Sequence, residues 1–178
     1  MEQNDWVVMN YTLPREPSRT RVSTWRKLKK IGAVNMQQSL WILPHTEENF
    51  RLFGEMKNDI SKNGGEALIM QSSTDEESRN AIIGRFHAAR NEEYKELLEQ
   101  CEDFFHEMDK ETARENFTFA EIEENEEELA KLKEWYQKIN ARDFFGAPLN
   151  EESKTALEKC GDLLDEFCDK VYEFNETV

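Results

Sequence analysis

The chain has 178 residues, enough for one domain or for one domain with a helical extension. It carries 38 acidic and 23 basic side chains, which give a formal net charge of −15. No run of 18 apolar residues is present, which excludes a membrane span. Eleven Phe, four Trp and four Tyr provide large anchors for a packed core, which excludes a disordered chain.

The sequence carries no motif of a known chemistry. It lacks a Gly-rich phosphate loop, a Cys-x-x-Cys pair and histidines at metal-ligand spacing, so we expect no cofactor, no metal and no enzyme activity. Residues 1–5 lack the features of a secretion signal. The odd number of cysteines (Cys101, Cys160 and Cys168) indicates reduced thiols and a cytoplasmic protein.

Charge is distributed unevenly along the chain. Residues 1–44 contain seven basic and three acidic side chains, whereas the remainder contains 16 basic and 35 acidic ones. A basic segment on an acidic body can bind a phosphate backbone or another anion, or the acidic body of a second copy. An ordinary solvated helix face is the plainer interpretation.

The first half alternates strand and helix patterns. Residues 6–13 form an apolar, β-branched run typical of a buried strand, and a helix is expected from 19 to 31. Residues 34–43 read as one bent strand or as a hairpin that turns near Gln37 and Gln38. A helix begins after Thr46, and a last strand covers 67–70. The order predicts an α+β fold with a ferredoxin-like βαββαβ antiparallel sheet, with a winged helix as the structural alternative.

The second half is helical, with apolar residues at steps of three and four. The spacing predicts helices over about 75–109, 119–141 and 150–174, that is, a helical hairpin followed by a C-terminal helix. Arg90 occupies one position of the first apolar seam. We therefore expect a ferredoxin-like domain over residues 1–73 and a three-helix extension over 74–178 that packs against it.

The first helix holds most of the basic residues. At 100° per residue, Val22, Trp25 and Leu28 share one arc, which is expected to pack on the core. The opposite, outward arc holds Arg19, Arg26, Lys27 and Lys30.

Arg21 and Lys29 fall near the apolar arc of this helix. A charge placed there must extend to solvent or find a partner. Arg21 can pair with Asp5 or Glu66, or it can bind an oxyanion from solution through its two-pronged guanidinium.

Several motifs together resemble the N-terminal domain of ChrB, the chromate resistance regulator. They are Trp6-Val7-Val8 to Pro14, Ser18-Arg19-x-Arg21-Val22-x-x-Trp25-Arg26, Gly32-Ala33-Val34, Trp41-Ile42-Leu43-Pro44, Gly64-Gly65-Glu66-Ala67 and Ile139-x-x-x-Asp143-Phe144-Phe145. The resemblance covers nearly all of residues 5–148. The second domain of full-length members is not part of these 178 residues, so we expect a free-standing homologue or a fragment.

The resemblance implies a chromate-responsive transcriptional regulator whose basic N-terminal residues sense chromate or contact DNA. Those positions correspond to Arg19, Arg21, Arg26, Lys27 and Lys29. With Arg15 and Lys30 they are the candidate residues for binding DNA or an oxyanion.

Two other functions are open. The chain can be an interaction module without a small ligand, in which heptad residues of the helical hairpin form a homodimer or dock to a separate regulator. It can also be a thiol-dependent chromate reductase that uses Cys168, which would require an accessible thiol of low pKa.

Overall fold

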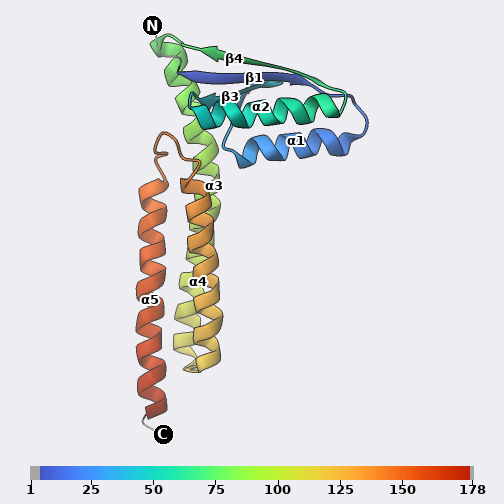
Figure 1. Ribbon diagram of the computed structural model, residues 1–178. Helices are drawn as coiled ribbons and strands as arrows, with labels where there is room; N and C mark the ends of the chain where they lie inside the picture. The colour runs from blue at the N-terminus through green and yellow to red at the C-terminus, as the bar shows by residue number, and fades with distance from the viewer. Residues whose placement is uncertain (1–4, 177–178) are drawn as a thin grey trace. The chain divides into compact units, whose positions relative to one another are not determined.

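The computed structural model describes residues 5–176, which form two compact units that divide within one long helix, between Ala89 and Arg90. Residues 1–4 lie outside the described part of the chain. The prediction that residues 1–5 are not a secretion signal falls mainly on them. We call the unit up to Ala89 the sheet unit and the unit from Arg90 the helical unit. The elements, labelled in Figure 1, are β1 (Trp6–Thr12), α1 (Ser18–Lys30), β2 (Val34–Gln37), β3 (Leu40–Pro44), α2 (Glu47–Lys62), β4 (Glu66–Ser72), α3 (Glu76–Ala113), α4 (Phe119–Asn140) and α5 (Asn150–Glu176).

The sheet unit is an α+β arrangement with the strand order β2-β3-β1-β4, in which every neighbouring pair is antiparallel. The segment 34–43 is a hairpin, and Gln38 takes the positive φ of 43° at its turn. The alternative of a single bent strand is therefore wrong. The winged-helix alternative is also wrong, because β1 is an inner strand that pairs along the sheet with both β3 and β4.

One face of the sheet is covered by α1 and α2, which Figure 1 shows on the same side. The core there contains Val7 and Met9 from β1, Leu28 from α1, and Phe53 and Ile60 from α2. Alternation along β1 sends Trp6 and Val8 to the other face.

The other face is partly covered by the beginning of α3. The Trp6 ring stacks on Phe86 of α3 with ring centroids 6.2 Å apart, and its indole Nε1 donates to Thr74 Oγ1 at 3.0 Å. Ile82, on the same stretch of α3, is also buried. The predicted seam residue Ile83 is less buried than its neighbour Ile82, so the seam is shifted by one residue at this point.

The helical unit contains the rest of α3 together with α4 and α5, as the spacing predicts. Most of its core comes from the three predicted seams, including Leu97, Leu132 and Leu164, and the core also contains Phe105 and Ala147, which the spacing does not predict. Phe174, which the spacing also assigns to a seam, is 47% exposed and is the exception. The heptad positions therefore pack within the chain, which leaves few of them for contact with a second copy.

Among the described residues, no helix is long and apolar enough to cross a membrane.

Candidate functional site

The first helix, α1, presents the candidate residues. It carries six basic and no acidic side chains between Ser18 and Lys30. Its last turn holds Lys27, Lys29 and Lys30, whose positive charges are favourable at the negative end of the helix dipole. The helix ends where Gly32 adopts a φ of 82°, a conformation that glycine takes without strain.

The buried residues of α1 are not those of the predicted apolar arc. Thr24 and Leu28 are buried, whereas Val22 is 44% and Trp25 is 49% exposed. The Thr24 hydroxyl donates to the carbonyl of Thr20 one turn back at 3.1 Å, which satisfies its polar group against the core. The expectation that Val22 and Trp25 pack on the core is wrong, because the i, i+4 row Thr20-Thr24-Leu28 makes that contact instead.

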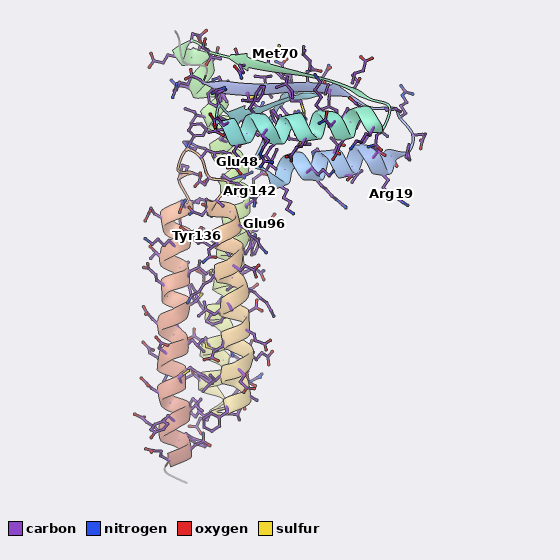
Figure 2. The ribbon with its side chains drawn as sticks, in the orientation of Figure 1. Arg19, Glu48, Met70, Glu96, Tyr136 and Arg142 are labelled. Atoms are coloured by element: carbon purple, nitrogen blue, oxygen red, sulfur yellow. The ribbon has the colours of Figure 1, made fainter. Side chains whose placement is uncertain are left out.

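This rotation of α1 leaves its charged side chains in solvent. The exposed set consists of Arg19, Arg21, Arg26, Lys27, Lys29 and Lys30, and we call it the basic face of α1. Arg15 is also exposed and lies in the segment before the helix. Figure 2 labels Arg19 on α1.

Arg21 is exposed, so the prediction of a charge forced toward the core is wrong. Of its two expected partners, Asp5 pairs with Arg79 at 3.1 Å. Within residues 5–176, Arg21 makes no ion pair with Glu66 or with another acidic residue. Its guanidinium is open to a ligand from solution.

Two basic side chains of α1 contact other residues of the sheet unit. Lys27 Nζ lies 2.7 Å from Asp59 Oδ2 of α2, and this hydrogen bond lowers the pKa of the Asp59 carboxyl. Lys29 Nζ lies 5.7 Å from the centroid of the Trp25 ring, a cation–π contact that holds the exposed indole beside the basic face.

A shallow hollow runs along the basic face, lined by Arg19, Val22, Ser23, Arg26 and Lys30 among others. Guanidinium, ammonium and hydroxyl groups are the donors that bind the oxygens of phosphate and related oxyanions. Sequence reasoning missed Ser23 in this hollow and Asp59 as the counter-charge of Lys27. The spacing of Thr20, Thr24 and Leu28 was the available sequence signal for the buried side of α1, and hence for which residues of α1 are exposed.

A second polar cluster lies in the helical unit around Arg90. This side chain is 1% exposed, and its Nη2 lies 2.9 Å from Glu93 Oε1. Arg142 binds the same carboxylate through two hydrogen bonds, of 2.6 and 3.3 Å. Burial lowers the pKa of Arg90, and its Nε and Nη1 have no hydrogen-bond partner among the described residues.

The neighbouring Asp143 holds the connection between α4 and α5. Its carboxylate accepts from the Tyr94 hydroxyl at 3.1 Å, from the Ala147 amide at 2.9 and 3.0 Å and from Asn150 Nδ2 at 2.8 Å. Asp143 belongs to one of the motifs that carry the family resemblance. Its contacts give that motif a structural role in this unit.

The cysteines lie in the helical unit, two of them in its core. Cys101 and Cys160 are fully buried. Cys168 is partly buried, and burial raises the pKa of its thiol. A raised pKa disfavours the thiolate that the thiol-dependent alternative requires. In the described part of the chain, no three His, Cys, Asp or Glu side chains are grouped so that they could hold a metal ion.

Comparison with known proteins gives one finding. The model of the family described as Protein ChrB, N-terminal, matches residues 21–178. The match begins inside α1, so it includes Arg21, Arg26, Lys27, Lys29 and Lys30, while Arg15 and Arg19 lie before it. No curated protein matches the sequence.

Proposed function

The chain belongs to the ChrB N-terminal family, which associates it with chromate resistance, and we propose that it is a cytoplasmic regulatory protein whose α1 binds the phosphate backbone of DNA. One observation carries this proposal. The helix α1 carries six exposed cations and contains no acidic residue.

The exposure of these cations favours a polyanion over a single small ion. An exposed charge pair contributes only about 0–1 kcal/mol in water, so an isolated oxyanion on this surface would bind weakly. A phosphate backbone contacts many cations at once and releases counterions with each contact. The cations of α1 are spread along a helix of 13 residues, which suits an extended ligand.

The acidic net charge is compatible with this proposal because the charges are segregated. Residues 1–89 contain 12 basic and 11 acidic side chains, whereas residues 90–178 contain 11 basic and 27 acidic ones. The net charge of −15 therefore arises in the helical unit. Repulsion from those acids weakens DNA binding, and salt screens this repulsion over about 8–10 Å as it also screens the attraction of the basic face.

The connectivity β1-α1-β2-β3-α2-β4 and the antiparallel pairing support a finer assignment of the sheet unit as ferredoxin-like. In that assignment α1 is the first of the two helices that cover the sheet.

The test is binding of labelled duplex DNA, measured by fluorescence anisotropy at several salt concentrations. We expect weak, salt-dependent binding with a slope of log K against log salt of about −3 to −5, from four to five phosphate contacts. The double variant Arg19→Glu, Arg26→Glu should abolish it, because it reverses two of the six charges of the basic face.

A matched control is Lys133→Glu, Lys154→Glu, which makes the same change of net charge on exposed lysines of the helical unit. If both double variants lose binding equally, the effect is one of net charge, and the assignment to α1 is wrong.

Calorimetric titration with chromate, sulfate and phosphate tests the alternative that α1 binds a small oxyanion and not DNA. Selective chromate binding that is lost in Arg21→Ala, with no binding of DNA, would replace the DNA proposal with an oxyanion sensor at the same helix.

A further inference from the structure

Trp25 of α1 lies exposed among the cations of the basic face. Its side chain is 49% exposed, whereas Trp6 and Trp41, the other tryptophans of the sheet unit, are 2% and 3% exposed. An exposed indole offers a large apolar surface for a ligand to cover, and tryptophan is enriched at binding surfaces. The question is which ligand suits an indole in these surroundings.

The neighbours of Trp25 along α1 are cations. Arg21 precedes it by four residues and Lys29 follows it by four, so the three form one row with successive residues about 6 Å apart along the helix axis. The Lys29 ammonium lies 5.7 Å from the centroid of the indole ring. Val22, three residues before Trp25, is 44% exposed and adds to the apolar surface. The row therefore places an aromatic surface between two positive charges.

Such a row suits the repeating groups of a single-stranded nucleic acid. Each nucleotide carries one phosphate, which attracts a cation, and one planar base, whose face stacks on an aromatic ring. In a duplex the bases already stack on one another, so a side chain reaches the face of a base only where the strand is opened or a step is unstacked. The indole thus distinguishes the two forms, although the cations attract both.

From these observations we infer that Trp25 is a stacking site for an unpaired base, and that the basic face of α1 binds single-stranded nucleic acid more tightly than duplex of the same length. This inference rests on the proposed binding of DNA by α1 and names the form of nucleic acid that the surface prefers. Arg21 and Lys29 contact the phosphates on either side of the stacked base in this arrangement.

An anionic membrane surface fits α1 less well. A helix that lies in a membrane interface buries a broad apolar face. Leu28 is buried in the core of the sheet unit, so the large apolar side chains that α1 exposes are Val22 and Trp25. Two such residues among six cations suit a base and its phosphates better than they suit acyl chains.

The experiment is fluorescence anisotropy of the full chain with three labelled probes of about 12 nucleotides. They are a thymidine strand, a strand of the same length whose sugars carry no bases, and a duplex. We expect the thymidine strand to bind more tightly than the abasic strand and the duplex. The abasic strand carries the same phosphates, so its difference from the thymidine strand reports the bases alone.

Trp25→Ala should weaken binding of the thymidine strand about fivefold or more. It should leave binding of the abasic strand and the slope of log K against log salt unchanged, because it removes no cation. Trp25→Phe, which keeps an aromatic ring, should retain part of the preference. The position is exposed, so the fold should persist, and circular dichroism checks this. The matched control is Phe50→Ala, which removes an aromatic side chain of α2 that is 43% exposed and should change nothing.

Two results would overturn the inference. One is equal binding of the thymidine and abasic strands by the wild type, and the other is a preference that survives in Trp25→Ala. Binding to phosphatidylserine vesicles that is lost in Trp25→Ala, without a preference among the strands, would assign Trp25 to a membrane instead.

Failure of this inference is distinguishable from failure of the proposed function. Duplex binding that is lost in Arg19→Glu, Arg26→Glu but is unaffected by Trp25→Ala, with no preference for the thymidine strand, leaves the basic face in place and removes only the stacking site. No binding of any of the three probes overturns both.

Discussion

The two units of this chain use their surfaces in opposite ways. The sheet unit has a net charge near zero but places its cations together on α1, and it exposes apolar side chains at Val22, Trp25, Leu68 and Met70. The helical unit carries the acidic excess and uses its regular apolar positions to build its own core. The proposed DNA-binding surface therefore belongs to the sheet unit, whereas the acidic excess belongs to the helical unit.

The interiors of the two units also differ. The core of the sheet unit consists of apolar side chains and a close approach of backbone at Gly65. The helical unit instead contains a buried guanidinium at Arg90, which is compensated by Glu93. The stability of one unit should therefore respond to steric changes and that of the other to changes of charge.

The largest expected effect is at Glu93. Glu93→Gln removes the carboxylate that Arg90 and Arg142 share, and it leaves the buried Arg90 charge without its closest counter-ion. Breaking a buried pair in this way should reduce the free energy of unfolding by about 3 kcal/mol. Urea denaturation followed by circular dichroism at pH 7 measures it.

The matched variant is Arg90→Met, which removes the buried charge itself. Because Glu93 keeps its two hydrogen bonds from Arg142, this change should alter stability by no more than about 1 kcal/mol. If Arg90→Met is as destabilising as Glu93→Gln, the buried charge is not the dominant factor in this cluster.

A somewhat smaller effect is expected at Gly65 in the sheet unit. A Cβ atom there would lie 2.3 Å from the carbonyl oxygen of Thr12 and 2.8 Å from Ile60 Cγ2. Gly65→Ala must displace β1 from the start of β4 and should cost about 2 kcal/mol. A shift of the urea midpoint provides the measurement.

Gly161 offers the opposite case in the helical unit. It lies within α5, and a Cβ atom there would meet nothing within 4 Å. Gly161→Ala should stabilise the chain by up to about 1 kcal/mol, because alanine is the better helix former. If Gly65→Ala and Gly161→Ala change the free energy of unfolding equally, the steric contact at Gly65 does not distinguish the two sites.

The sequence predicts the elements of both units well, for different reasons. Thr46 marks the start of α2 because its side chain accepts from the Asn49 amide, and the steps of three and four residues locate Leu97, Leu132 and Leu164 in the helical core. Such signals depend on neighbouring residues in the chain, so they can be recognised without knowledge of the tertiary structure.

The rotation of α1 could not be predicted in the same way. An apolar arc through Val22 and Trp25 is the natural choice from hydrophobicity alone. The helix instead packs through Thr20, Thr24 and Leu28, because the Thr24 hydroxyl bonds to its own helix backbone and its remaining surface is small. The positions of Trp25 and Arg21 in solvent depend on this tertiary choice.

The exposure of β4 was also beyond local reasoning. The sequence predicts a strand at 67–70, but its position at the edge of the sheet follows from the pairing of β1 with both β3 and β4. In this position Leu68 and Met70 are exposed.

A further small effect is a loss of stability at alkaline pH that arises mainly in the helical unit. Burial, with the nearby Asp143 carboxylate, raises the pKa of the Tyr94 phenol well above its ordinary value near 10. Above pH 10 the unfolded chain loses this proton while the folded chain keeps it, so stability falls as pH rises. At pH 11 the contribution of one such tyrosine is a loss on the order of 1 kcal/mol.

Tyr94→Phe isolates this contribution. The variant loses its hydrogen bond to Asp143 and is less stable at every pH, so the quantity to compare is the drop in unfolding free energy between pH 8 and pH 11. That drop should be smaller in Tyr94→Phe than in the wild type. Tyr11→Phe makes the same change in the sheet unit, where burial also raises the pKa of the phenol. No carboxylate contributes to the raised pKa of Tyr11. Tyr11→Phe should therefore reduce the drop in unfolding free energy between pH 8 and pH 11 less than Tyr94→Phe does. An equal change in both variants would show that burial alone, and not Asp143, sets the alkaline sensitivity of the helical unit.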